Sequence, residues 1–255
     1  MTEFLTLIFD VDGTLANTEK DGHRIAFNQA FAEAGLDWEW SVSLYGELLA
    51  IAGGKERIKY YIEQYKPKYE LSLSLPVFIP YLHKSKTNYY QKLLETGAIP
   101  LRPGVKRLLT EARKNKMRLA IATTSTFTNV TKLLEHTLGK DSISWFEIIA
   151  AGDIVPAKKP APDIYYYVLE KMNIQPNNCI VFEDSHYGLQ AALQVGLKTI
   201  VTVNNYTKNQ DFTGATLVLD NLGEPEKEFT VISGNAQDKT YVDLDFINNL
   251  STIND

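Results

Sequence analysis

Short apolar runs that end in polar residues alternate with stretches of helical periodicity along most of the chain. The apolar runs predict strands near 4–10, 118–123, 146–150, 179–183, 198–203 and 216–219, with a weaker one at 229–232. Helices are expected near 105–114, 129–137, 162–172, 187–194 and 242–250. This alternation predicts right-handed crossovers and a parallel sheet that helices cover on both faces.

Between the first and second strands the pattern is helical throughout. Helices are expected at 18–34, 41–51, 55–66 and 75–96, and residues that end helices follow three of them: Gly35, Pro67 and Gly97. The first strand needs sheet partners, and this block supplies none. The predicted fold class is therefore α/β, with a parallel-sheet core (1–15 and 101–255) and an inserted all-helical cap domain (16–100).

Composition narrows the classes of function. The chain has 255 residues, a formal net charge of −5 and 44% hydrophobic residues. The charge argues against a nucleic-acid partner. Because no apolar stretch of about 20 residues and no signal-type segment is found, we expect no membrane partner and a cytoplasmic protein, or a stromal one if the chain is a processed plastid form. A monomer is expected, and Cys179 is interpreted as a buried structural thiol.

Two aspartates follow the first apolar run, in the sequence Asp10-Val11-Asp12-Gly13. In an open parallel sheet, ligands bind outside the carboxyl ends of the strands. One carboxylate there can attack an electrophile, and a second can transfer the proton of the leaving group. The alternative is a polar turn without chemistry.

Three other strand ends carry polar groups. Thr123, Thr124 and Ser125 offer hydroxyl and N–H donors to an anion, although such a run also serves as a loop or helix cap. Lys159 follows the third strand and is either a charge partner for a phosphoryl group or a surface lysine.

The last of these three strand ends, the fourth site in all, carries Glu183 and Asp184. Oxygen ligands without clustered His or Cys suit Mg²⁺ better than zinc. Asp184 is alternatively a helix cap.

In this order, the four sites resemble the motifs of haloacid dehalogenase-like phosphotransferases. The resemblance implies a Rossmann-like sheet, Mg²⁺ and an aspartyl-phosphate intermediate. It assigns Asp10 as nucleophile, Asp12 as general acid and then base, Thr123 as a donor to phosphoryl oxygens and Lys159 as the balancing charge. The metal ligands that it implies are Asp10, Asp12, Glu183 and Asp184.

Segments 18–24, 44–49, 53–57 and 82–87 resemble the cap of the CbbY proteins, phosphatases of xylulose 1,5-bisphosphate, an inhibitor of Rubisco. The partner would then be a small sugar bisphosphate. A helix that opens with Gly54 and Lys55 also favours an anion by its free N–H groups. The expected substrate-binding residues are Glu19, His23, Tyr45, Gly54, Lys55, Arg57, Lys84, Thr124 and Ser125.

Each of these residues has a structural alternative. The charged ones could form the solvated faces of helices, and Tyr45 could belong to the cap core. His83, His136 and His186 are interpreted as surface or structural residues, and the tyrosine runs as packing. The chain departs from the broader capped family at Asn17, where an aspartate is frequent, and a one-residue insertion is expected within 20–22.

The sequence thus predicts a Mg²⁺-dependent phosphatase that converts xylulose 1,5-bisphosphate to xylulose 5-phosphate. A mutase of the β-phosphoglucomutase type and a phosphatase of another small sugar phosphate are the alternatives. A phosphate-binding module without turnover is a third.

Overall fold

The computed structural model of the chain describes residues 5–51, 53–66 and 74–252. Its internal contacts divide the chain into two compact units, Met1–Asn17 with Pro100–Asp255 and Thr18–Ile99. We call them the core unit and the helical unit. Both borders lie within two residues of those expected from the sequence.

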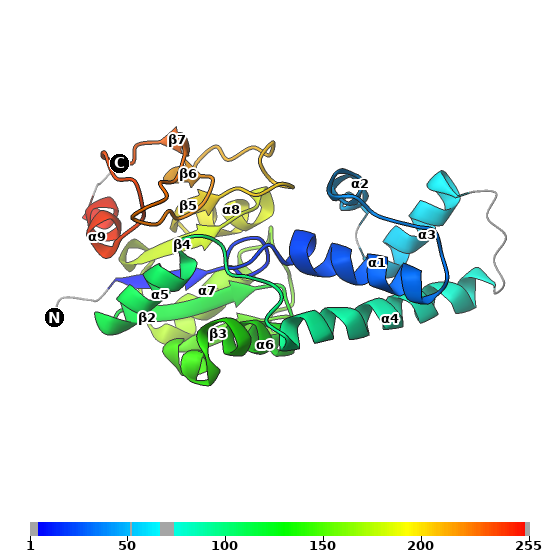
Figure 1. The fold of residues 1–255 in the computed structure, drawn as a ribbon. Coiled ribbons are helices and arrows are strands. Elements are labelled where there is room, and N and C mark those ends of the chain that lie inside the picture. The colour runs from blue at the N-terminus through cyan, green and yellow to red at the C-terminus, as the bar shows by residue number, and fades with distance from the viewer. Residues whose placement is uncertain (1–4, 52, 67–73, 253–255) are drawn as a thin grey trace. The chain divides into compact units, whose positions relative to one another are not determined.

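Seven strands form one sheet in the described part of the core unit, in the order β3-β2-β1-β4-β5-β6-β7 (Figure 1). The first six strands are parallel, and β7 is antiparallel to β6. Their bounds are β1 Thr6–Phe9, β2 Arg118–Thr123, β3 Ile148–Ala151, β4 Cys179–Glu183, β5 Lys198–Thr202, β6 Leu217–Leu219 and β7 Val231–Gly234. The predicted parallel α/β sheet is confirmed.

The register of the central strands brings their carboxyl ends together. Phe9 of β1 pairs with Ile121 of β2 on one side and with Phe182 of β4 on the other. Every residue of β1 is buried, as expected for a strand covered on both faces. Residues that follow these three strands therefore emerge at one edge of the sheet.

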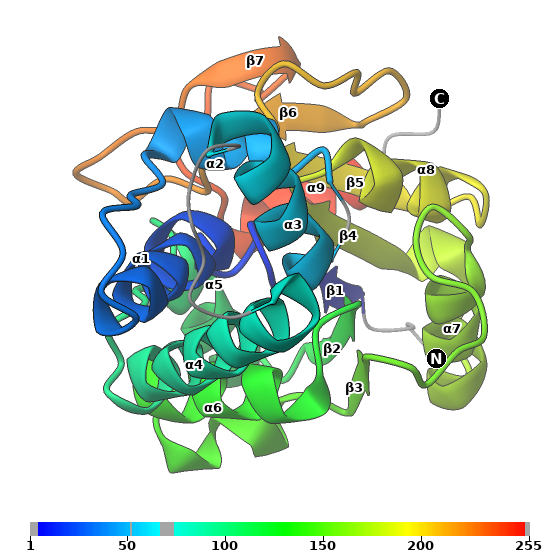
Figure 2. The same cartoon turned by 90° about the vertical axis from the view of Figure 1, so that its right-hand side faces the viewer.

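Helices cover both faces of the sheet. Figure 2 shows α5 and α6 on one face and α7 and α8 on the other. The second pair packs its apolar side chains on Ile8, Ala120 and Val181. The helices of the core unit are α5 Val105–Lys114, α6 Phe127–Leu138, α7 Asp163–Met172, α8 His186–Leu193 and α9 Leu244–Thr252, with 3₁₀ turns at Lys140–Trp145 and Pro176–Asn178.

Several boundaries differ from the prediction because capping side chains set them. The helix expected from 129 begins at Phe127, since the Thr126 hydroxyl accepts the N–H of Asn129. The helix expected from 242 begins at Leu244, where Asp243 Oδ1 accepts the N–H of Phe246 at 2.7 Å. The weak strand lies at Val231–Gly234, two residues late, and is an exposed edge. Phe4, the expected start of the first strand, lies outside the described residues.

The helical unit contains α1 Arg24–Glu33, α2 Val42–Leu48, α3 Gly54–Tyr65 and α4 Leu75–Glu95, preceded by a π-helical turn at Thr18–His23. One continuous α-helix at 18–34 was expected, and its first turn is wrong. A π turn contains more residues than an α turn. An extra residue within 20–22 could therefore be accommodated in this turn. Gly22 lies in this turn, where an added Cβ would stand 2.8 Å from the Tyr90 ring. Pro67, the expected helix end, lies outside the described residues.

Aromatic side chains fill the interior of the helical unit. The ring of Trp40 lies 4.6 Å from Phe27, 4.9 Å from Phe31 and 5.4 Å from Tyr61, between ring centroids. In Figure 1, α1 and α4 run side by side. In the part of the chain that the structure describes, no helix has the length and apolarity needed to cross a lipid bilayer.

Candidate active site

The ammonium of Lys159 joins two carboxylates at the carboxyl edge of the sheet. It donates to Asp10 Oδ1 at 2.8 Å, to Glu183 Oε1 at 2.5 Å and to the Ala122 carbonyl at 2.8 Å. All three of its N–H groups are thereby used. The side chains of Lys159, Asp10 and Glu183 are only 7%, 10% and 1% exposed, so this is a buried charge cluster. The alternative of a solvated surface lysine at 159 is wrong.

Glu183 is held at both carboxylate oxygens. Besides Lys159, its Oε1 accepts from the Tyr165 hydroxyl at 2.9 Å. Its Oε2 accepts from the N–H of Asp184 at 3.1 Å and from the Ser185 hydroxyl at 3.3 Å. Gly188 leaves room for this carboxylate, because an added Cβ there would lie 2.0 Å from it. Glu183 therefore has one fixed orientation.

Asp184 lies against the turn that follows β1. Its Oδ2 accepts from the Asn204 amide at 2.6 Å. Gly13 has a φ of +94°, and an added Cβ there would stand 2.2 Å from the same Oδ2. Only glycine suits both the backbone and the space at this position.

Burial controls the protonation of the cluster. It raises the pKa of Asp10 to about 7, against the lowering effect of Lys159, and Glu183 raises it further. Burial, then Asp10 and Glu183, raise the pKa of Asp184 well above its usual range. For Lys159, burial alone would lower the pKa, but Asp10, Glu183 and Tyr165 raise it well above its usual value, and the ammonium stays charged.

The carboxylates fit a divalent cation. Ligand oxygens of Asp10, Glu183 and Asp184 lie within 4.8 Å of one another, while half-buried Asp12 is outside this group of three among the described residues. Three buried acids beside one lysine leave excess negative charge, which adds to the effect of burial in raising the pKa values of Asp10 and Asp184. An oxygen-only set of this kind suits Mg²⁺.

The hydroxyl run after β2 divides into different environments. Thr123 is buried, and its hydroxyl accepts the N–H of Ser125 at 3.2 Å. Thr124 is exposed and Ser125 is half-buried. Helix capping falls to Thr126, so the capping alternative for 123–125 is wrong.

A chain of hydrogen bonds connects three predicted residues of the helical unit. The Tyr45 hydroxyl donates to Glu19 Oε2 at 2.6 Å, and Arg57 Nη1 donates to the Tyr45 oxygen at 3.0 Å. Arg57 also donates to the carbonyls of Leu48 and Ile51. Arg57 is buried, so the solvated-face alternative fails for it. Tyr45 is fully buried, which bears out its placement in the core of this unit.

His23 lies beside Lys86, a lysine that is not among the predicted binding residues. Nζ of Lys86 lies 2.8 Å from His23 Nδ1, and the His23 ring stacks on Tyr90 at 3.8 Å. Lys86 is buried, whereas Lys84 is exposed. The sequence predicts Lys84 as the binding lysine of this helix, but Lys86 is the one that shares the buried face of α4 with Leu82 (i−4) and Tyr90 (i+4).

The start of α3 is less open than expected. An added Cβ at Gly54 would lie 2.8 Å from the His83 ring, and one at Gly53 would lie 2.1 Å from a Glu56 carboxylate oxygen. Lys55 is exposed. Burial, Lys86 and Lys55 lower the pKa of His83, which favours its neutral form.

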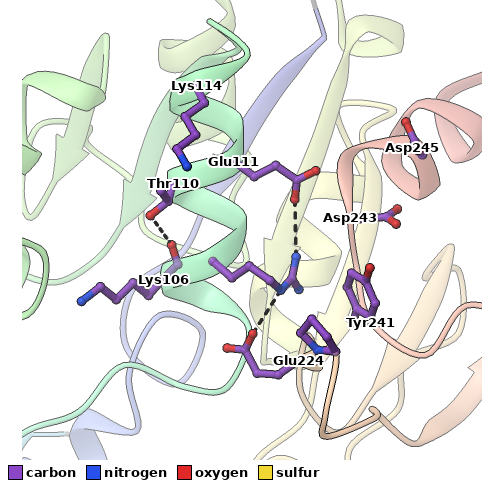
Figure 3. A pocket seen from close by; sticks show the side chains of 10 residues that line it. Lys106, Thr110, Glu111, Lys114, Glu224, Tyr241, Asp243 and Asp245 are labelled. Atoms are coloured by element: carbon purple, nitrogen blue, oxygen red, sulfur yellow. Dashed lines mark hydrogen bonds and ion pairs between the residues drawn. The ribbon is translucent and has the colours of Figure 1, made fainter.

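Tyr165, Asn204 and Lys86 were missed by the sequence analysis. Tyr165 lies in a run interpreted as packing, and Asn204 stands in no recognisable motif. A hollow of about 690 Å³ beside α5 contains none of the predicted residues (Figure 3). Arg107, which lines this hollow, forms ion pairs with Glu224 at 3.1 Å and with Glu111 at 3.5 Å, so we interpret these charges as structural.

Comparison with known proteins identifies the family of the chain. The model of the haloacid dehalogenase-like hydrolases matches residues 4–196. The CbbY protein encoded on a plasmid of Cupriavidus necator is 45% identical over 86% of this chain and 86% of its own length. A crystal structure of a mutant CbbY from Rhodobacter sphaeroides in complex with xylulose 1,5-bisphosphate is 41% identical, has a TM-score of 0.70, and is covered over 95% of its length by 86% of this chain.

The structure of a putative β-phosphoglucomutase from Thermotoga maritima is 26% identical, with a TM-score of 0.68 over 84% of this chain and 93% of that one. The similarity to the CbbY proteins is therefore higher and covers most of both chains. The chain belongs to the haloacid dehalogenase-like hydrolases, and within them it is a sugar-phosphate phosphatase of the CbbY type.

Proposed function

We propose that the protein is a Mg²⁺-dependent sugar-bisphosphate phosphatase that converts xylulose 1,5-bisphosphate to xylulose 5-phosphate, with Asp10 as the nucleophile. The observation that carries this proposal is the buried Asp10 carboxylate, held at one oxygen by Lys159 and close to Asp184. Lys159 holds Oδ1 of the Asp10 carboxylate, and in this proposal Oδ2 of Asp10 attacks phosphorus.

The proposed reaction has two steps. Asp10 attacks phosphorus while Asp12 donates a proton to the departing sugar oxygen, and Asp12 then removes a proton from the water that releases phosphate. Asp12 is half-buried, so water can reach it. The buried Thr123 hydroxyl and the ammonium of Lys159 stabilise the charge of the phosphoryl oxygens.

The metal requirement is supported by the acids themselves. Asp10 and Asp184 would hold Mg²⁺ directly, and the backbone carbonyl of Asp12, whose carboxyl group serves proton transfer, would complete the set. Both oxygens of Glu183 already accept hydrogen bonds, so we assign Glu183 chiefly to fixing Lys159 and the cluster. When bound, the ion neutralises phosphoryl oxygen charge.

The substrate is proposed from two supports. A relative that is 41% identical is described in complex with xylulose 1,5-bisphosphate. The helical unit also carries polar groups suited to a sugar phosphate. Glu19, which the buried Tyr45 orients, binds a hydroxyl, and Arg57 holds a second phosphate, with Lys55 and the Lys86–His23 pair as further donors.

A phosphate-release screen over sugar monophosphates and bisphosphates, with Mg²⁺ and with chelator, tests this function. We expect the highest kcat/KM for xylulose 1,5-bisphosphate and no turnover with chelator. A clear preference for monophosphates contradicts the second-phosphate assignment. An isomeric sugar phosphate without free phosphate contradicts hydrolysis and supports a mutase.

A further inference from the structure

Arg102 is a buried arginine whose guanidinium donates hydrogen bonds to backbone carbonyl oxygens. It is 7% exposed. Nη1 donates to the carbonyls of Gly13 and Thr202, and Nη2 donates to those of Val203 at 2.6 Å and Asp220 at 2.7 Å. An arginine placed in this way links chain segments through a rigid, planar fork of N–H groups.

One of these segments is the turn that carries Asp12. Within it, the N–H of Gly13 donates to the Ala16 carbonyl at 2.7 Å, and the N–H of Leu15 donates to that of Val11 at 2.9 Å. Arg102 contacts this turn twice. Its guanidinium donates to the Gly13 carbonyl, and its backbone N–H donates to the Leu15 carbonyl at 2.8 Å. The Arg102 guanidinium thus connects this turn to the residues at the end of β5, Thr202 and Val203.

A second segment leads to Asp184. Val203, whose carbonyl accepts from Arg102, immediately precedes Asn204, and the Asn204 amide holds the Asp184 carboxylate at 2.6 Å. The two segments also touch, because an added Cβ at Gly13 would lie 2.2 Å from Asp184 and 2.8 Å from Asn204. A shift of the Gly13 peptide would thus move the Asp184 carboxylate.

From this geometry we infer that Arg102 is a positioning residue for the cation site, which sets the spacing between the Asp12 turn and Asp184. The inference rests on the proposed function and deepens it. Arg102 acts through Gly13 and Asn204, and Tyr165 with Lys159 supports Glu183 independently. Loss of Arg102 should therefore weaken cation binding more than sugar binding.

Arg107 provides a matched control. It is less deeply buried than Arg102, but it too donates to a backbone carbonyl, that of Gly223 at 3.0 Å, and to Glu224 at 3.1 Å. Its hydrogen bonds to Glu111, Leu222, Gly223 and Glu224 lie away from the 11–16 turn. Arg102→Met and Arg107→Met remove the same type of side chain from the same unit.

The test measures Mg²⁺ binding by titration calorimetry without substrate, together with kcat and KM. For Arg102→Met we expect Mg²⁺ affinity and kcat to fall by about tenfold or more, as for other residues that orient metal ligands, with KM for the sugar phosphate nearly unchanged. Arg107→Met should lower thermal stability and leave Mg²⁺ affinity as in the wild type.

Arg102→Lys covers the case in which the methionine variant does not fold. A single ammonium keeps the charge and cannot replace the fork, so this variant should fold and bind Mg²⁺ more weakly than the wild type. Wild-type Mg²⁺ affinity in a folded Arg102 variant would overturn the inference, as would an equal loss in Arg107→Met. Because cation binding is measured without substrate, a wrong substrate assignment leaves this result readable.

Discussion

Nζ of Lys159 lies 2.8 Å from Oδ1 of Asp10, and both side chains are almost fully buried. The same ammonium also binds Glu183, so one positive charge serves two acids. Removing one partner of a buried ion pair leaves an uncompensated charge, which costs far more than losing an exposed pair. This buried cluster is therefore a determinant of stability.

Lys159→Met should lower both stability and turnover. The substitution leaves the buried Asp10 and Glu183 without their cation, and we expect a loss of about 3–5 kcal/mol in the free energy of unfolding. Since phosphoryl charge also loses its partner, kcat should fall by about 100-fold or more. Urea unfolding and phosphate release measure the two effects.

Lys158→Met is the matched control. Lys158 is adjacent in sequence, but it pairs with Asp153 at the surface, where their side chains are 52% and 90% exposed. This variant should behave as the wild type in both assays. Similar losses in the two lysine variants would show that the Lys159 cluster has no special role.

Tyr165→Phe removes one hydrogen bond from Glu183 and keeps the ring. Because three other donors still hold the carboxylate, we expect a loss of about 1–2 kcal/mol in stability and a decrease in kcat of no more than about tenfold. Tyr166→Phe is the control, since Tyr166 is 53% exposed. Equal stability of the two variants in thermal unfolding would argue against the Glu183 contact.

The raised pKa of Asp10 predicts how metal-free stability depends on pH. Its pKa moves from an ordinary 3.8 to about 7 in the folded protein, chiefly by burial. Within this window the folded state binds more protons than the unfolded state, so the contribution of Asp10 falls as pH rises from 3.8 to about 7. Asp184, whose pKa is also raised, acts in the same direction.

Asp10→Asn isolates this effect. Without metal, the variant should become more stable relative to the wild type as pH rises through the window. Mg²⁺ should stabilise the wild type more at the alkaline end, because it binds the ionised acids. Unfolding midpoints against pH, with chelator and with Mg²⁺, check this. A stability difference that stays constant with pH would contradict the assigned burial of Asp10.

Arg57→Met tests recognition by the helical unit. Arg57 binds Tyr45, which binds Glu19, so its loss should raise KM for a sugar bisphosphate by about tenfold or more and leave kcat less affected. Lys59→Met is the control on the same helix, since Lys59 is 59% exposed and pairs with Glu63. Should Arg57→Met lose kcat with an unchanged KM, the residue would not bind substrate.

The sequence was sufficient to select candidate site residues where the polar residue directly follows a predicted strand. An apolar run followed by an acid, a hydroxyl or a lysine predicted Asp10, Thr123 and Glu183, because parallel strands end at the same edge. The close contact of Lys159 with Asp10 and Glu183 needed the tertiary structure, since 149 and 24 residues separate the partners.

The rest depended on helix phase and long-range packing. Lys86 could have been preferred to Lys84, because it lies on the apolar face of α4 with Leu82 and Tyr90. Asn204 and Arg102 had no such signal, since each acts on backbone or side chains far away in sequence. The π turn at Thr18–His23 also has no pattern that distinguishes it from an α turn.

If Asp10 takes the phosphoryl group, an aspartyl phosphate forms during turnover, and chemical trapping detects it. Borohydride reduces an acyl phosphate to an alcohol, so the enzyme quenched during turnover of xylulose 1,5-bisphosphate with Mg²⁺ should contain homoserine at position 10, found by peptide mass spectrometry. Asp10→Asn should release no phosphate and give no such product. Turnover without trapping at position 10, trapping at another residue, or substantial phosphate release by Asp10→Asn would contradict the account.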